Sequence, residues 1–238
     1  MSFIIKDENG HNQVFEVVGS TEIRLKRRTN LIANAMKLKE NANACEVGSG
    51  TGEMSYWLAK DYPTMNITGI DVSNGFVELS KQKYQLPNLK YELIDFTEPN
   101  EFQNNQFDYL FGNGILHHLY YHLDDTLEKF KKITKSNGKI IFMEPNIYNP
   151  YVAVIFKIPY FRKKANLEPD EMAFSKNFIR KKLEAHGYKN IKIKYKDFLL
   201  PGVPSFMIKP LITIGAILEK IPILKLTSQS IFIEAEIS

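Results

Sequence analysis

Short apolar runs alternate with amphipathic stretches along most of the chain. Strand-like runs that alternate with helix-like stretches are typical of a parallel sheet with helices packed against it. Seven runs are expected to form strands, at 44–47, 66–71, 90–96, 106–113, 135–145, 191–195 and 230–237. Apolar residues at helical spacing predict helices at 21–38, 52–61, 73–84, 123–134 and 176–186. The last of these is expected to begin after an N-cap at Ser175 and to stop at Gly187.

The turn after the first strand carries three glycines at alternate positions, in Glu46-Val47-Gly48-Ser49-Gly50-Thr51-Gly52. Backbone can approach a ligand closely only where there is no Cβ and where positive φ is tolerated. The dinucleotide pattern G-x-G-x-x-G places its third glycine one residue later and seats an anionic pyrophosphate on a helix N-terminus. A carboxylate at Glu46 would repel a diphosphate but would suit an ammonium group. The loop therefore favours an amino-acid-like cofactor over a dinucleotide.

Two later strands also end in an acid. Asp71 follows Gly52 by 19 positions, close to the roughly 20 expected for an acid that binds ribose hydroxyls. Asp95 ends the third run and is followed by Phe96. Either acid alone could be an ordinary turn or N-cap residue, since Asp before Ser73 is common at a helix start. Their order after the glycine loop indicates a cofactor that contains a nucleoside.

The arrangement E-x-G-x-G-x-G resembles motif I of the class I S-adenosylmethionine-dependent methyltransferases. The segments 106–119 and 135–145 resemble the family's motifs IV and V, so the matches occur in the family's order. The resemblance covers 41–145 well and points to the small-molecule, ubiquinone-biosynthesis-like type. It implies an α/β fold with a doubly wound, Rossmann-like seven-stranded sheet, an antiparallel last strand, and insertions after strands five and six.

The resemblance also implies a set of cofactor-binding residues. In this family an acid placed like Asp95 bonds the adenine amino group, while apolar neighbours such as Val72 and Phe96 cover the ring. The implied cofactor is S-adenosyl-L-methionine. The residues implied to bind it are Glu46, Gly48, Ser49, Gly50, Thr51, Gly52, Asp71, Val72, Asp95, Phe96 and Asn113.

The length of 238 residues fits one domain with insertions. Residues 1–40 are expected to form an N-terminal segment and helix, and 41–238 a single methyltransferase domain. Two segments, 146–174 and 198–226, depart from a minimal cofactor domain and are rich in aromatic or aliphatic residues and proline. Insertions beside the carboxyl ends of parallel strands decide which substrate is bound, so both are expected to face the methyl acceptor.

Charge is distributed unevenly along the chain. Residues 1–150 carry a net charge of −3 and residues 151–238 a net charge of +7. The basic part suits an anionic membrane surface or a phosphate-bearing lipid-like or glycan substrate. Its lysines at 192, 194 and 196 could equally be the solvated face of one strand. Nucleic acid ranks last among the partners, because Gly112-Asn113-Gly114-Ile115 stands where base-directed methyltransferases carry an N/D-P-P-Y/F turn.

The predictions of cellular location and oligomeric state are based on weaker sequence patterns. No N-terminal segment has the order of a signal peptide, so the expected location is the cytoplasm, with contact at the inner face of the membrane as an option. The longest uncharged stretch near the C-terminus, 210–218, is too short to span a bilayer. A helix there could pack on the sheet, cover a greasy substrate, lie at an interface or form a homodimer contact. The single cysteine, Cys45, is expected to be a packing residue.

Candidate catalytic residues follow the fourth and fifth strands. Methyl transfer to a hydroxyl is helped by a group that removes its proton, and His117 and Glu144 would overhang the cleft. An alternative is that His117 and His118 only cap a helix and pack on the sheet. His118 and His122, with Asp124 and Asp125 nearby, have a spacing that could bind a metal on a helix. Without a third clear ligand, no metal site is predicted.

The expected function is methyl transfer to a small-molecule or lipid/glycan-like acceptor, directed to oxygen. A NAD(P)-dependent Rossmann oxidoreductase is the rival enzyme, disfavoured by the glycine spacing. A non-catalytic, methyltransferase-like binding protein is the second alternative, against which the intact loop and the acids at 46 and 71 argue.

Overall fold

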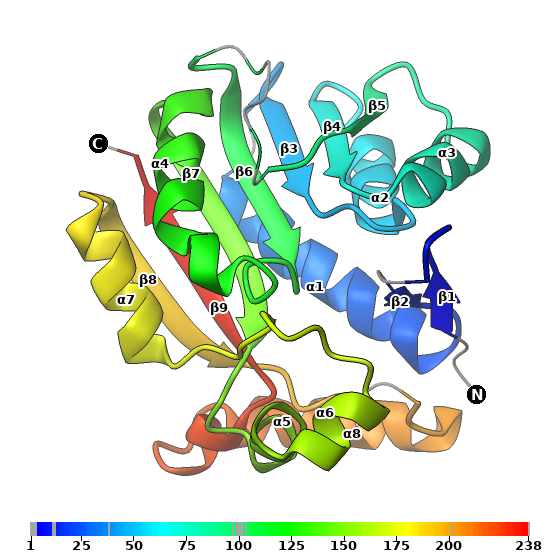
Figure 1. Cartoon of the computed structure of the whole chain (residues 1–238), viewed down its shortest axis with the longest axis vertical. Coiled ribbons are helices and arrows are strands. Elements are labelled where there is room, and N and C mark those ends of the chain that lie inside the picture. The colour runs from blue at the N-terminus through cyan, green and yellow to red at the C-terminus, as the bar shows by residue number, and fades with distance from the viewer. Residues whose placement is uncertain are drawn as a thin grey trace.

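A seven-stranded sheet organises the computed structural model, which describes residues 4–10, 13–37, 39–96, 98, 102, 104–200 and 202–237. The strand order is β5-β4-β3-β6-β7-β9-β8 (Figure 1). The strands are β3 (Asn43–Val47), β4 (Asn66–Asp71), β5 (Leu89–Leu93), β6 (Phe107–Asn113), β7 (Thr134–Pro145), β8 (Lys189–Lys196) and β9 (Ser230–Glu236). The first five pair in parallel, and β9 runs antiparallel between β7 and β8. The predicted fold class is confirmed.

Helices cover both faces of this sheet. They are α1 (Ser20–Met36), α2 (Glu53–Asp61), α3 (Asn74–Lys83), α4 (Leu123–Ile133), α5 (Pro150–Lys157), α6 (Pro159–Lys164), α7 (Lys176–Ala185) and α8 (Ser205–Leu218). Helices α1 and α2 pack on one face of the sheet, and α4 and α7 pack on the other (Figure 1). Two short 3₁₀ helices, Tyr120–His122 and Leu224–Thr227, complete the connections.

Strand periodicity divides the core into two layers. In β6, Tyr109 and Phe111 point into the layer with α1 and α2, whereas Phe107 and Leu110 point into the layer with α4 and α7. Successive side chains of a strand face opposite sides, so a strand covered on both sides is apolar at nearly every position. Cys45 is fully buried in the second layer, as a packing cysteine should be.

Most predicted boundaries agree with the structure to within two residues. Ser73 and Ser175 cap α3 and α7, each accepting a hydrogen bond from the amide three residues later. One strand was predicted too long, because β5 ends at Leu93 and not at residue 96. Its neighbour β4 ends at Asp71, and the amide of Ile94 donates to that residue's carbonyl as the last contact of the ladder.

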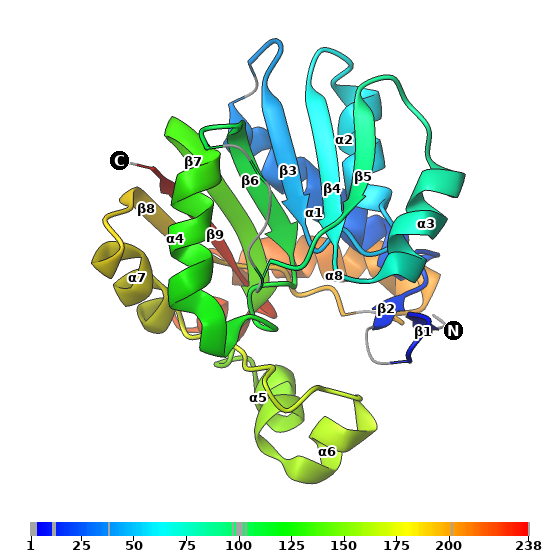
Figure 2. The same cartoon turned by 45° about the horizontal axis from the view of Figure 1, so that its top comes forward.

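Several segments gather beyond the carboxyl ends of the parallel strands. An N-terminal hairpin of β1 (Ile4–Lys6) and β2 (Gln13–Phe15) lies beside α3, and α5 and α6 project below the sheet (Figure 2). Pro150 and Pro159 occupy the first turns of α5 and α6, where a missing N–H costs nothing. Helix α8 crosses beneath the same end (Figure 1). The segments 146–174 and 198–226 thus flank the strand ends, and their role toward substrate stays a prediction.

Candidate active site

The glycine loop between β3 and α2 adopts a backbone that requires glycine. Gly48, Gly50 and Gly52 have φ values of 69°, 51° and 85°, in the left-handed region that disfavours a Cβ. A Cβ on Gly52 would also lie 2.7 Å from the hydroxyls of Ser80 and Tyr91. The Tyr91 hydroxyl donates to the Gly52 carbonyl at 2.7 Å and fixes the loop from behind.

The polar side chains of this loop are directed toward the protein. Thr51 Oγ1 donates to Glu53 Oε2 at 2.6 Å. The Ser49 hydroxyl is buried and has no hydrogen-bond partner among the residues that the structure describes. The Thr51 hydroxyl is thus occupied by Glu53, whereas the Ser49 hydroxyl is not bonded to a described residue. The predicted contacts of Ser49 and Thr51 with the cofactor stay predictions.

Glu46 lies buried beneath the loop. Its Oε2 accepts hydrogen bonds from the amide of Ser55 at 2.9 Å and from the hydroxyl of the same residue. Burial raises the pKa of Glu46 to about 8, and the nearby carboxylates of Glu53 and Asp71 contribute to the rise. Glu53 is already paired with Lys83 at 2.8 Å. A cationic ligand beside the loop would favour the ionised form of Glu46, whereas a diphosphate would be repelled by an ionised carboxylate there. This electrostatic pattern fits the sulfonium and ammonium groups of S-adenosylmethionine.

Asp71 links the glycine loop to the second βα turn. Its Oδ2 accepts from the Gly50 amide at 2.7 Å and its Oδ1 from the Ser73 amide at 2.9 Å. Burial raises the pKa of Asp71 despite these amide donors. Each carboxylate oxygen can accept a second bond, so the predicted ribose contact is compatible with this geometry. Val72 beside it is 52% exposed and is placed to cover an adenine ring.

Asp95 and Phe96, the third group of predicted cofactor residues at a strand end, differ in their exposure to solvent. Asp95 is exposed, in keeping with its predicted contact to the cofactor. Phe96 is only 5% exposed, and its ring lies 5.1 Å from that of Phe130 in the core. Phe96 thus packs between sheet and helix, and its contact with an adenine ring stays a prediction. Leu93, the last residue of β5, is 52% exposed.

Asn113, the last residue of β6, is held by a residue that sequence reasoning missed. Arg28 of α1 donates from Nη1 to Asn113 Oδ1 at 2.8 Å, and from Nη2 to Ser230 Oγ at 2.8 Å. The same guanidinium bonds Asp197, just after β8, at 2.9 Å. Arg28 thereby ties three strand ends together, and the Asn113 side-chain oxygen already has a protein partner.

His117 and Glu144, the two candidate catalytic residues, are in direct contact. Glu144 is fully buried, and its two oxygens accept from the amides of Ile115, Leu116 and His117 and from His117 Nδ1, the last at 2.9 Å. A carboxylate with four donors inside the protein does not itself overhang the cleft. Glu144 fixes the loop after β6 and the ring of His117 through these bonds, and its catalytic role stays a prediction.

The opposite nitrogen of His117 faces an acid that the sequence did not single out. His117 Nε2 lies 3.8 Å from Glu171 Oε2, and His118 Nδ1 lies 3.4 Å from Glu171 Oε1. Burial by itself lowers the pKa of His118, but neighbouring acids, Glu168 and Glu171 first among them, raise it above its ordinary value. The sequence signal for this acid was the acid-rich run at 168–171. No local pattern in the sequence predicts that this run lies beside the histidines.

The metal spacing considered from the sequence is not assembled. Asp124 instead pairs with Lys182 at 2.6 Å and with His186 at 2.9 Å on the outer surface. A different set does come together: within the described part of the chain, one ligand atom each from His117, His118 and Glu171 lie within 4.8 Å of one another. Two imidazoles and a carboxylate are suitable ligands for a divalent cation.

The N-terminal hairpin closes the site from the side opposite His117. Glu8 accepts from the Gly75 amide at 2.9 Å and from the Ser73 hydroxyl at 3.2 Å, at the start of α3. Val14 lies 3.0 Å from where a Cβ of Gly50 would be. Gln13 donates to the Ala165 carbonyl, at the end of α6. These contacts place β1 and β2 against the glycine loop. The sequence did not predict this packing.

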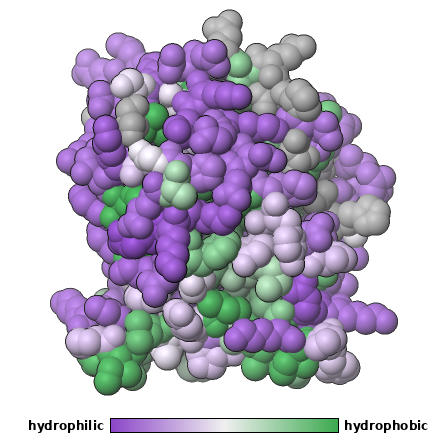
Figure 3. Space-filling model, turned by 60° about the vertical axis from the view of Figure 1, so that its left-hand side comes forward, coloured by the Kyte–Doolittle hydropathy of each residue, from purple (hydrophilic) through white to green (hydrophobic). Residues whose placement is uncertain are grey.

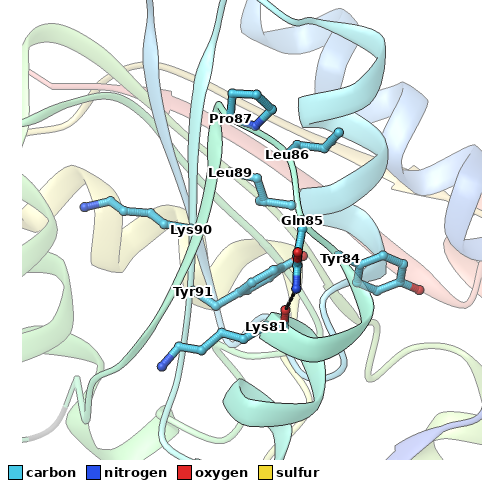
Figure 4. A pocket seen from close by; sticks show the side chains of 8 residues that line it. All are labelled: Lys81, Tyr84, Gln85, Leu86, Pro87, Leu89, Lys90 and Tyr91. Atoms are coloured by element: carbon cyan, nitrogen blue, oxygen red, sulfur yellow. Dashed lines mark hydrogen bonds between the residues drawn. The ribbon is translucent and has the colours of Figure 1, made fainter.

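A hollow in the described surface lies elsewhere. It has a volume of about 460 Å³ and is lined by residues of the last turn of α3 and of β5, among them Lys81, Tyr84 and Lys90 (Figure 4). This hollow opens beside an edge strand, away from the carboxyl ends of β3, β6 and β7. The chemistry of the strand ends, and not the size of this hollow, identifies the candidate site.

Comparison with known proteins agrees with this geometry. A family model described as a methyltransferase domain matches residues 38–186, more than half of the chain. A demethylmenaquinone methyltransferase of Staphylococcus aureus is 25% identical over 178 residues, which cover 67% of this chain and 73% of the relative. A malonyl-[acyl-carrier protein] O-methyltransferase of Acetivibrio thermocellus is 25% identical over 119 residues. That match covers 49% of this chain and 41% of the relative, so the chain spans less than half of that protein.

A solved structure extends the likeness to the whole fold. A SAM-dependent methyltransferase from Archaeoglobus fulgidus superposes with a TM-score of 0.63 at 17% identity, covering 90% of this chain and 93% of that one. The domain match includes the glycine loop, both strand-end acids and the His117 loop. It selects the methyltransferase hypothesis over the oxidoreductase alternative. The chain belongs to the methyltransferase-domain family, and its fold and motifs are those of a class I S-adenosylmethionine-dependent methyltransferase.

Proposed function

We propose that the protein transfers a methyl group from S-adenosylmethionine to an oxygen atom of a small-molecule or lipid-like acceptor. The observation that carries this proposal is the pairing of His117 Nδ1 with the buried Glu144 carboxylate at 2.9 Å. His117 lies on the loop after β6 and Glu144 near the end of β7. The loop is next to the glycine loop, since Ile115 contacts the Gly48 position. A histidine oriented by a carboxylate is a suitable proton acceptor for a hydroxyl group.

The roles of the protein groups follow from this pairing. The ionised Glu144 can only accept, so it holds a proton on His117 Nδ1 and leaves Nε2 with a lone pair. His117 Nε2 would take the proton of the acceptor hydroxyl as that oxygen forms its bond to the methyl carbon. When bound, S-adenosylmethionine supplies an electrophilic methyl carbon on a neutral leaving group. Asp71 and the glycine loop would orient it, and the hairpin and α5 would exclude water.

The surroundings of the site support an apolar acceptor. Large apolar side chains are exposed on α5, α6, α8 and the turn after it, including Tyr160 at 67%, Phe206 at 80% and Ile223 at 76%. Apolar atoms gather along the lower edge of the molecule, below a mainly hydrophilic surface (Figure 3). No acid occurs between 151 and 167, whereas Lys157, Lys163 and Lys164 do. Exposed apolar side chains beside lysines favour a lipid-like acceptor that the protein reaches at a membrane surface. The alternative is that a second copy of the protein covers the same apolar surface in a homodimer.

Membrane contact, in this proposal, is peripheral. Within the described residues, no helix is long and apolar enough to cross a bilayer. The same apolar edge adjoins the predicted substrate-facing segments, 146–174 and 198–226.

Cofactor turnover tests the proposal directly. The protein is incubated with methyl-labelled S-adenosylmethionine and pooled metabolites or lipid extracts, and S-adenosylhomocysteine is quantified. We expect turnover that depends on one pool, with the label recovered as an O-methyl product by mass spectrometry. Binding of S-adenosylmethionine without turnover on any pool would favour the non-catalytic alternative. Label recovered on nitrogen or carbon would contradict the oxygen-directed part.

A second candidate function uses the same groups differently. His117, His118 and Glu171 could hold a divalent cation that lowers the pKa of an acceptor hydroxyl, because their ligand atoms lie within 4.8 Å of one another. Glu144 would then be the carboxylate that orients a ligating histidine. In that arrangement His117 Nε2 binds the cation and is not the proton acceptor.

Chelation separates these two mechanisms. We expect protein treated with EDTA and desalted to keep its rate of S-adenosylhomocysteine formation, because His117 needs no cation to accept a proton. Metal content of the purified protein is measured in parallel, with His118→Asn as the matched variant. A loss of rate that Zn²⁺ or Mn²⁺ restores in the wild type, and not in His118→Asn, would replace the histidine-base mechanism with the metal-assisted one.

A further inference from the structure

Three arginines of α1 converge on one carboxylate. Arg28 Nη2 lies 2.9 Å, Arg24 Nε 3.5 Å and Arg27 Nη1 3.6 Å from the oxygens of Asp197. Positions 24, 27 and 28 share a helix face because they are three and four residues apart. The Asp197 side chain is only 5% exposed, so the group is assembled at the junction of α1 with the end of β8.

The positive charge of this arginine cluster (Arg24, Arg27 and Arg28) exceeds what its surroundings balance. Asp197 is the only acid, among the described residues, that forms an ion pair with any of the three. Glu219 is close, since it accepts from the Asp197 amide at 2.9 Å, but its other oxygen is paired with Lys196. Three cations therefore share one anion.

The three guanidinium groups are not equally satisfied. Arg28 is buried and bonded to Asp197, Asn113 and Ser230, which is a structural role. The Nε of Arg24 is shielded from solvent and lies 3.5 Å from Asp197 Oδ2, but it forms no hydrogen bond with any of the described residues. Burial lowers the pKa of Arg24 to about 9, and repulsion from Arg28 adds to this. A buried donor without an acceptor is costly, and an anion placed there would remove that cost.

The arginine cluster belongs to the acceptor side of the active site. Arg28 touches Asn113 at the end of β6, and the loop that carries His117 begins at the next residue. Tyr151 of α5 is near enough to Arg24 to influence it electrostatically, and Phe156 of the same helix contacts the ring of His117. Five residues of helix advance about 7.5 Å. Helix α5 thus spans the space between the arginine cluster and the proposed proton acceptor.

We propose that Arg24 and Arg27 bind an anionic group, a carboxylate or a phosphate, of the methyl acceptor. The proposal rests on the proposed function and specifies its substrate class: an acceptor with a methylatable oxygen at one end and an acid group at the other. Guanidinium groups bind both anions through paired hydrogen bonds. The anion could belong to a soluble metabolite or to a lipid headgroup, since the chemistry is shared.

Anion titration tests this proposal without requiring turnover. Inorganic phosphate and malonate are titrated into the full-length protein, saturated with S-adenosylhomocysteine, by calorimetry at constant ionic strength. We expect saturable binding to the wild type that is about tenfold or more weaker in Arg24→Gln and in Arg27→Gln. Lys26→Gln is the matched control, because it removes the same charge from an exposed position of α1 that pairs with Glu22.

A second variant and a vesicle-binding measurement ensure that each outcome either supports or contradicts the proposal. Arg27 is partly exposed, so Arg27→Gln tests the idea even if Arg24→Gln fails to fold. Phosphatidylcholine vesicles with and without phosphatidic acid identify the source of the anion: Arg24-dependent binding to the acidic vesicles assigns it to a lipid headgroup, and binding of phosphate or malonate alone assigns it to a soluble compound.

The inference is overturned if no probe binds saturably, or if binding is equal in wild type and both arginine variants. Failure of the proposed function has a different signature. If the protein binds phosphate through Arg24 but never forms S-adenosylhomocysteine, the anion site is supported and the methyl-transfer proposal is refuted.

Discussion

The variant His117→Asn is expected to lower kcat for methyl transfer by about 10²–10⁴-fold, the usual contribution of a positioned proton acceptor. Asparagine can still donate from its side-chain amide toward Glu144 Oε2, in the place of Nδ1. It offers no nitrogen lone pair where Nε2 was. The loss should therefore fall on the chemical step, measured as S-adenosylhomocysteine formed per minute at saturating substrates.

Binding and folding should be unaffected in this variant. Cofactor affinity, measured by calorimetry, is expected to depend on the glycine loop and Asp71 and so to stay the same. His118→Asn is the neighbouring control and should retain most of the rate. An unchanged kcat in His117→Asn would refute the assignment of His117 as proton acceptor.

The variant Glu144→Gln is expected to lower the free energy of unfolding by about 2–4 kcal/mol, because it leaves buried donors without acceptors. Glu144 receives bonds from three backbone amides and from His117 Nδ1. Glutamine has a single acceptor oxygen, and its NH₂ group would face N–H groups. Urea denaturation followed by circular dichroism measures the change.

A surface acid provides the control for this second prediction. Glu234 of β9 pairs with the exposed Lys194 at 3.3 Å, and Glu234→Gln should cost less than about 1 kcal/mol. The rate should also fall in Glu144→Gln, because the ring of His117 loses its orientation. If Glu144→Gln were as stable as Glu234→Gln, the four-donor arrangement around Glu144 would not be the native one.

The sequence was sufficient for the sheet, for most helices and for the cofactor loop. Strands and helices follow from local periodicity, and caps such as Ser73 and Ser175 act within three residues of chain. The glycines at 48, 50 and 52 were identifiable because positive φ at alternate positions is a local backbone requirement. Family resemblance then placed Asp71 and Val72 at positions that the structure keeps near the loop.

The directions in which side chains at the strand ends point were harder to predict from the sequence. Phe96 was expected to cover the adenine ring, and the structure shows that the chain leaves the sheet after Leu93 and turns that side chain into the core. Glu144 and His117 were predicted as separate groups beside the cleft, and their direct contact was not predicted. The burial of Glu144 depends on the loop at 115–117 folding over it, which the sequence of β7 does not encode.

What the sequence determined by itself is therefore the local part: periodic elements, the glycine turn and the order of acids along the strands. Only the tertiary structure brought Arg28 to Asp197, 169 positions away, and Glu171 to His117. The physical reason is that charge balance and burial are properties of space. A carboxylate or guanidinium acquires its role from the groups that packing places around it, and those groups come from chain segments that have no local relation to one another.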